Sequence, residues 1–71
     1  MIKLRSLLGI MGSIVKIKIS NYLGAEVYAK VDTVEAILVL LDSNQLTCRG
    51  DWFVYGIYQK DDYISVEVLS E

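Results

Sequence analysis

The chain has 71 residues and a mass of 8.0 kDa, which allow a single small domain over residues 1–71. It contains no histidine, no proline and one cysteine, so histidine triads, histidine- or cysteine-rich metal sites and disulfide frameworks are excluded. We therefore expect no enzymatic activity and no cofactor. Hydrophobic residues make up 54% of the chain, more than so small a core usually hides, so we expect a homo-oligomer.

The formal net charge of −2 conceals an uneven distribution of charge along the chain. Residues 1–30 carry five basic side chains and one acidic one, whereas residues 31–71 carry two basic and eight acidic side chains. A basic half of this kind can face phosphates, can meet the acidic half of another copy, or can simply be a solvated surface.

The N-terminal region is not predicted to be a targeting signal or a membrane span. Lys3 and Arg5 precede the apolar stretch 7–15, but glycines interrupt that stretch and no small-residue cleavage site follows it. No run approaches the roughly 20 apolar residues that cross a bilayer, so we expect no membrane partner. The unpaired Cys48 agrees with a reducing compartment, and we expect a cytoplasmic protein.

Residues 2–11 predict a short amphipathic helix, because four apolar side chains recur at the spacing of one helical face. These are Leu4, Leu7, Leu8 and Met11. Gly12 is well placed to end the helix. From residue 14 the hydrophobic period changes to two, which predicts an antiparallel pair of half-buried strands over residues 14–20 and 25–32.

Residues 34–41 admit two interpretations, because most of the segment is an unbroken apolar run without a clear period. A helix would place several apolar side chains on one face, and Asp32 with Glu35 resembles a capping box. The run is short, rich in branched side chains and flanked by strand patterns, so we favour a central strand.

The longest predicted strand covers residues 46–58 and is apolar on both faces from Trp52 onward. We expect one face to meet the domain core and the other to meet a second copy or another protein. The interface candidates are Trp52, Phe53, Tyr55 and Tyr58. Val54 and Tyr58 are expected on the same face. A closing strand is predicted over residues 62–69.

One short helix followed by five short strands and tight turns predicts a mainly β fold. The expected architecture is a strongly bent, five-stranded antiparallel sheet that forms a partly open small barrel of the Sm-like or SH3-like kind. Such barrels keep at least one exposed edge, through which strand addition builds dimers and rings.

Two segments of the chain resemble the motifs of the Sm/LSm family of small RNA-associated barrels. The first contains Leu7-Leu8, Gly12, Val15-x-Ile17-x-Ile19, Gly24, Val27 and Val31. The second contains Cys48-Arg49-Gly50-Asp51 followed by Phe53-Val54-Tyr55. The resemblance implies a ring of identical subunits that binds single-stranded RNA, with Arg49 lining its inner opening. The family's base-contacting asparagine is missing from the corresponding residues 35–39.

The candidate nucleic-acid site comprises Arg49, Gly50, Lys16 and Lys18. The planar fork of Arg49 suits a phosphate or a base, and Gly50 allows a tight turn close to a ligand. The two lysines lie on the outer face of the first predicted strand. Plainer interpretations exist for both parts of this site. Residues 49–51 can simply form a turn with an Arg49–Asp51 ion pair, and Lys16 and Lys18 can be solvated side chains that protect a sheet edge.

The aromatic side chains of residues 52–58 suit base stacking, although such residues more often belong to cores and interfaces. The principal functional hypothesis is thus a non-enzymatic Sm-like ring that binds single-stranded RNA. The alternative is a small homo-oligomeric protein-interaction module without a nucleic-acid role.

Overall fold

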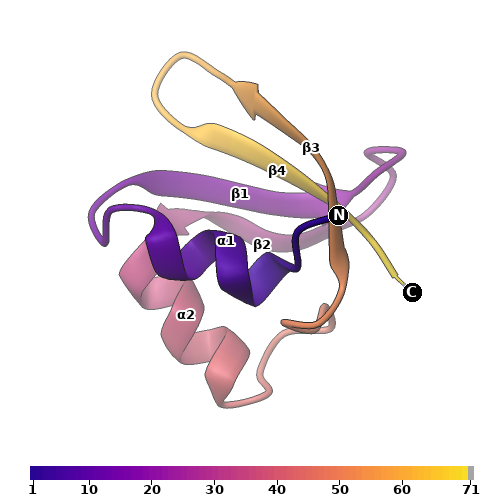
Figure 1. The fold of residues 1–71 in the computed structure, drawn as a ribbon. Coiled ribbons are helices and arrows are strands. Elements are labelled where there is room, and N and C mark those ends of the chain that lie inside the picture. Colours follow the sequence, from indigo (N-terminus) through magenta and orange to yellow (C-terminus); the bar gives the residue numbers. More distant parts are fainter. Residues whose placement is uncertain (71) are drawn as a thin grey trace.

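The computed structural model describes residues 1–70, which form two helices and four strands (Figure 1). In chain order the elements are α1 (Leu4–Ile10), β1 (Lys16–Asn21), β2 (Val27–Thr33), α2 (Val34–Asp42), β3 (Phe53–Gln59) and β4 (Ile64–Leu69). The strands form one sheet in the order β2-β1-β4-β3. Two antiparallel hairpins, β1–β2 and β3–β4, are joined at the centre of the sheet by the parallel pair β1–β4.

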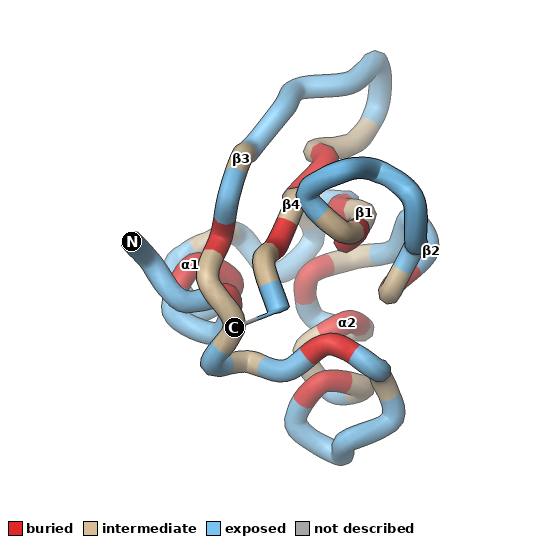
Figure 2. The backbone as a smooth tube through the Cα atoms, turned by 90° about the vertical axis from the view of Figure 1, so that its right-hand side faces the viewer, coloured by how far each residue is buried: buried red, intermediate tan, exposed pale blue. Residues whose placement is uncertain are grey.

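The domain is a small mixed α/β fold with an open sheet, so the prediction of a five-stranded, mainly β barrel is wrong. β2 and β3 are the two edges of the sheet and do not pair with each other. Both helices lie on one face of the sheet, and the other face carries no helix (Figures 1 and 2). The structure therefore has two free edges, which a closed barrel would lack, and among the residues described no helix covers the second face of the sheet.

The predicted central strand over residues 34–41 is instead most of α2. Thr33 begins the helix, because its Oγ1 accepts a hydrogen bond from the backbone N–H of Ala36 at 3.2 Å. The helical spacing brings three large side chains into the core together: Val34, Ile37 and Leu41. Burial of this face outweighs the strand preference of branched side chains. The helix also supplies the crossover that the parallel β1–β4 pair requires.

The predicted strand over residues 46–58 is also too long, since β3 begins only at Phe53. The preceding loop is held outside the sheet by α1. Backbone N–H groups at the start of α1 donate hydrogen bonds to the carbonyl oxygens of Trp52 and Gly50, at 2.8 and 2.9 Å. These N–H groups have no partner within their own helix, so the loop satisfies them.

The hydrophobic core fills the space between the helices and one face of the sheet. Each helix and each strand contributes side chains to the core, but the C-terminal halves of the edge strands β2 and β3 do not. The large side chains with essentially no exposure are Leu4, Leu8, Ile17, Ile19, Val34, Ile37, Val66 and Val68. Because this core lies on one side only, the side chains that alternate with it in the strands face away from both helices.

Candidate nucleic-acid interface

The uncovered face of the sheet, which we call the open face, is the candidate site. Buried side chains in β1 and β4 alternate with side chains that point to the other side of the sheet. The buried set is Ile17, Ile19, Val66 and Val68. The alternating set on the open face is Lys16, Lys18, Ser20, Ser65 and Glu67. Two of the four predicted nucleic-acid residues, the lysines, therefore lie on this face.

Aromatic side chains from β3 share the open face. Cross-strand partners in a sheet point to the same side, so the register of β3 against β4 fixes their direction. Tyr58 pairs with Ser65, and Phe53 pairs with Leu69. Both rings thus stand on the same side as Ser65 and away from the helices. Tyr58 is 45% exposed, and Phe53 is half-buried.

A bulge in β3 adds a second aromatic pair at one end of the open face. Tyr55 is the extra residue between Val54 and Gly56, which pair with successive residues of β4. The bulge shifts the alternation by one residue, so Val54 is buried while Tyr58 faces outward. The expectation that these two share a face is therefore wrong. The Tyr55 ring packs against Tyr22, with ring centroids 5.1 Å apart.

The basic side chains of the open face lie next to another aromatic ring. The Lys18 Nζ lies 6.0 Å from the centroid of the Tyr63 ring, at the outer limit of a cation–π contact. Lys16 is exposed at the start of β1. Neither lysine forms an ion pair with any residue in the described part of the chain. Both ammonium groups are therefore available to an anionic ligand.

The centre of the open face carries small side chains. Ser20 and Ser65 are only 4% and 5% exposed although no helix in the described part of the chain covers them. Ser65 lies between Lys18 and Tyr58 in the sheet, and Ser20 lies beside Glu67. At Gly56, an added Cβ would lie 2.6 Å from the Tyr58 hydroxyl. Glycine at this position therefore allows the Tyr58 ring to lie along its own strand.

One carboxylate interrupts the open face. Glu67 lies in β4 beside Ser20 of β1 and Gly56 of β3. It is half-buried and has no ion-pair partner among the residues described. Glu67 lowers the positive potential that Lys16 and Lys18 create, so any attraction for phosphates is modest.

Arg49 and Gly50 lie on the helix side of the molecule and do not join the lysines. The Gly50 carbonyl accepts a hydrogen bond from the Arg5 backbone N–H, and a Cβ at Gly50 would lie 3.0 Å from the Arg5 Cβ. The glycine thus allows close packing against α1. The exposed Arg49 has its Nε 3.8 Å from the Asp51 Oδ1, as expected for an ion pair within a turn.

The four predicted interface residues separate into two groups. Trp52 is half-buried and packs edge-on against Tyr28, with ring centroids 5.3 Å apart, where it closes the rim of the core. Trp52 is therefore a packing residue in this chain. Phe53, Tyr55 and Tyr58 lie along β3, and the two tyrosines are substantially exposed.

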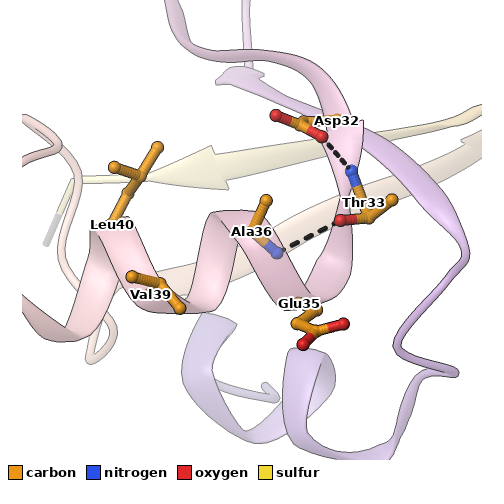
Figure 3. Close-up of a pocket in the computed structure, with 6 residues that line it drawn as sticks. All are labelled: Asp32, Thr33, Glu35, Ala36, Val39 and Leu40. Carbon is orange, nitrogen blue, oxygen red and sulfur yellow. Dashed lines mark hydrogen bonds between the residues drawn. The ribbon is translucent and has the colours of Figure 1, made fainter.

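A shallow depression of about 470 Å³ lies at the junction of β2 and α2 (Figure 3). It is lined by Asp32, Thr33, Glu35, Ala36, Val39 and Leu40. The polar groups at its rim mostly serve the helix start. The Asp32 Oδ1 accepts a hydrogen bond from the Thr33 N–H at 2.7 Å, and Thr33 caps α2. Its two carboxylates and the lack of basic residues in its lining make it unsuitable for phosphate.

Tyr22 and Tyr63 were not among the predicted site residues. The signal for Tyr63 was present in the sequence, because it alternates with Ser65 and Glu67 on the polar side of the last strand. An aromatic ring on the polar side of a strand is a candidate binding residue. Tyr22 follows a strand in a turn, and only the tertiary structure brings it to Tyr55.

Comparison of the chain with protein-family models, with curated protein sequences and with solved structures found no match. Within residues 1–70, neither helix is long and apolar enough to cross a membrane.

Proposed function

We propose that the protein binds single-stranded nucleic acid on the open face of its sheet. The observation that carries this proposal is the combination of solvent-facing tyrosines on β3 with Lys16 and Lys18 on β1, which form no ion pair within residues 1–70. The Sm-like ring is not proposed, because the barrel on which it depends does not form. The RNA-binding hypothesis is retained on a different surface from the one that the sequence motifs indicated.

Stacking supplies the affinity in this proposal. Single-stranded bases expose their ring faces, and each base stacked on an aromatic side chain contributes about 1–3 kcal/mol. Tyr55 and Tyr58 are 55% and 45% exposed, and Tyr58 lies along the sheet beside Gly56. Duplexes keep their bases stacked on each other, so the open face is expected to prefer single strands over duplexes.

In this proposal the lysines neutralise phosphate groups of the bound nucleic-acid strand. Lys16 and Lys18 stand two residues apart on β1, while the tyrosines line β3, with β4 between the two strands. A bound strand would place its bases over β3 and its phosphates toward β1. Glu67 lies between these two rows and accepts hydrogen bonds only, so it would favour bases that present amino groups.

The test is fluorescence anisotropy of labelled U-rich, A-rich and C-rich RNA, with the matching DNA oligonucleotides, at two salt concentrations. We expect weak, salt-sensitive binding to single strands and little binding to duplexes. Replacing both lysines by alanine should reduce the slope of log K against log salt by about 1.4, which corresponds to two lost phosphate contacts on a single strand.

Arg49→Ala is the matched control for charge, because it removes a basic side chain from the helix side of the molecule. It should leave the affinity and the salt slope unchanged. For stacking, Tyr55→Ala should weaken binding about tenfold, whereas Tyr55→Phe keeps the ring and should retain it. Absence of binding at low salt, or an effect of Arg49→Ala equal to that of the lysine variant, would refute the proposal.

A further inference from the structure

We infer that two copies of the chain associate through the outer edges of their β3 strands, from Gly56 to Gln59, and so form a continuous eight-stranded sheet. The two copies are related by a two-fold axis, which makes the paired strands antiparallel. This inference concerns the edge of the sheet and does not depend on the proposed nucleic-acid binding at its face.

The two edges of the sheet differ in their fitness for pairing. β2 carries two register shifts within seven residues and the charged side chains of Lys30 and Asp32, features that discourage strand addition. Beyond its single bulge, β3 is regular from Gly56 to Gln59 and carries no charge there. Ile57, on this edge, is 51% exposed. An uncharged, regular and exposed edge is the kind that adds a strand.

The start of the same edge already accepts a strand from elsewhere in the chain. The Val54 N–H donates to the Ile2 carbonyl oxygen at 2.9 Å, and Lys3 forms an antiparallel bridge with Phe53. This segment covers only the beginning of β3. From Gly56 onward the outward-facing backbone groups of β3 have no partner strand within the described part of the chain.

The hydrogen-bond pattern of the β3–β4 hairpin determines which groups face outward. The Lys60 N–H donates to the Tyr63 carbonyl oxygen at 2.8 Å, so Lys60 is a residue that faces β4. Because this direction alternates along an antiparallel ladder, the backbone N–H and C=O groups of Tyr58 also point toward β4. Those of Ile57 and Gln59 point away from β4, toward the outer edge of the sheet. These are the groups that a second copy can bond.

One register satisfies these outward groups in both copies. If Ile57 of each copy pairs with Gln59 of the other, all the N–H and C=O groups of both residues are bonded across the two-fold axis. Tyr58 then lies opposite Tyr58 of the second copy, with both rings on the open face. Pairing Ile57 with itself would instead leave Gln59 opposite the irregular bulge at Tyr55.

The charges at the ends of the paired strands favour a second copy as the occupant. In this register the Asp61–Asp62 turn of the second copy approaches the segment of residues 1–3, because both occupy the line of strand beside β3, and the exposed Met1 is the residue that it meets first. The carboxylates of the turn are thus brought toward the ammonium group of Lys3. The same complementarity occurs twice, once on each side of the two-fold axis.

The first test is the mass of the protein in solution, measured by sedimentation velocity over a range of concentrations without nucleic acid. The wild-type chain should reach twice its 8.0 kDa mass. Ile57→Lys should weaken the dimer by about tenfold or more, because it places charged side chains beside the two-fold axis. Val31→Lys is the matched control at the other edge, where the replaced side chain is 43% exposed, and should leave the dimer intact.

The second test examines the register by disulfide formation in a Cys48→Ala background, which removes the only native thiol. Tyr58→Cys should form a covalent dimer on mild oxidation, because residue 58 faces itself across the axis. Gln59→Cys should not. A monomer at all concentrations, loss of the dimer in Val31→Lys, or covalent dimers from Ile57→Cys in place of Tyr58→Cys would each overturn the inference.

Discussion

At the scale of single residues, Cys48 shows how burial changes the chemistry of a side chain. The thiol is 3% exposed and belongs to the core cluster. Burial disfavours its charged thiolate form and raises its pKa from an ordinary value of 9.0 to about 11, an effect that a backbone hydrogen bond reduces. The thiolate is the reactive form of cysteine, so Cys48 is unreactive in the folded chain at neutral pH.

The shifted pKa of Cys48 predicts a loss of stability at alkaline pH. Below about pH 9 the thiol is protonated in both the folded and the unfolded chain, so it adds no pH dependence. Between about pH 9 and about pH 11 only the unfolded chain releases the proton, which lowers the free energy of unfolding by about 1.4 kcal/mol per pH unit.

Urea unfolding of the wild-type chain and of Cys48→Ala at about pH 8 and about pH 10 measures this contribution. As the pH rises, the variant should become more stable relative to the wild-type chain, because every other group is common to the two chains and its contribution cancels in the difference. A difference that stays constant across this range would show that Cys48 titrates normally.

At the scale of elements, α2 shows tertiary packing deciding between two local structures. Its sequence is rich in branched residues and lies directly after β2. The helix forms because one of its faces fits the core, because Thr33 caps its first turn, and because the connection from β2 to β3 must cross the sheet. The Arg5 Nε also lies 3.1 Å from the Asp42 Oδ1 and links the two helices at the surface.

The helix cap is testable by a single substitution. Thr33→Ala removes the hydroxyl that accepts the Ala36 N–H and should lower the free energy of unfolding by about 1 kcal/mol. Thr47→Ala is a matched control, because this exposed loop threonine makes no side-chain hydrogen bond in the described chain. It should change stability by less than about 0.5 kcal/mol in chemical denaturation. Equal losses in the two variants would contradict a capping role.

At the scale of the whole molecule, the order of the strands determines which parts of the sheet are protected. β1 and β4 each pair on both sides, whereas β2 and β3 each pair with one neighbour in the sheet. Among the strands, β1 and β4 also carry the most deeply buried apolar side chains. A closed barrel would protect the backbone amides of all its strands more evenly. In an open sheet, amide hydrogen exchange is expected to differ between the central and the edge strands.

Amide hydrogen exchange, followed by NMR at low protein concentration, should therefore find the slowest amides in β1 and β4. Those of Ile17, Ile19 and Val66 are expected among them. The outward-facing amides of β2 should exchange much faster, because no strand of residues 1–70 pairs with that edge. Protection in β2 equal to that in β1 would contradict an open edge.

The sequence by itself determined the features that rest on short-range patterns. Period-two alternation indicated the half-buried strands of the first hairpin and of the chain's end, and helical spacing indicated the N-terminal helix. It also placed Lys16 and Lys18 on the side of their strand opposite the buried Ile17 and Ile19. These features follow from the direction of successive side chains, which the local backbone geometry fixes.

Only the tertiary structure decided the features that depend on distant partners. The apolar run of α2 has no period that distinguishes a helix from a buried strand, and its burial against the sheet selects the helix. The bulge at Tyr55 arises from pairing with β4, and it turns Tyr58 to the open face. The loop before β3 is held by α1, which takes Arg49 away from the lysines. Each outcome depends on contacts between segments far apart in the chain, which local patterns do not encode.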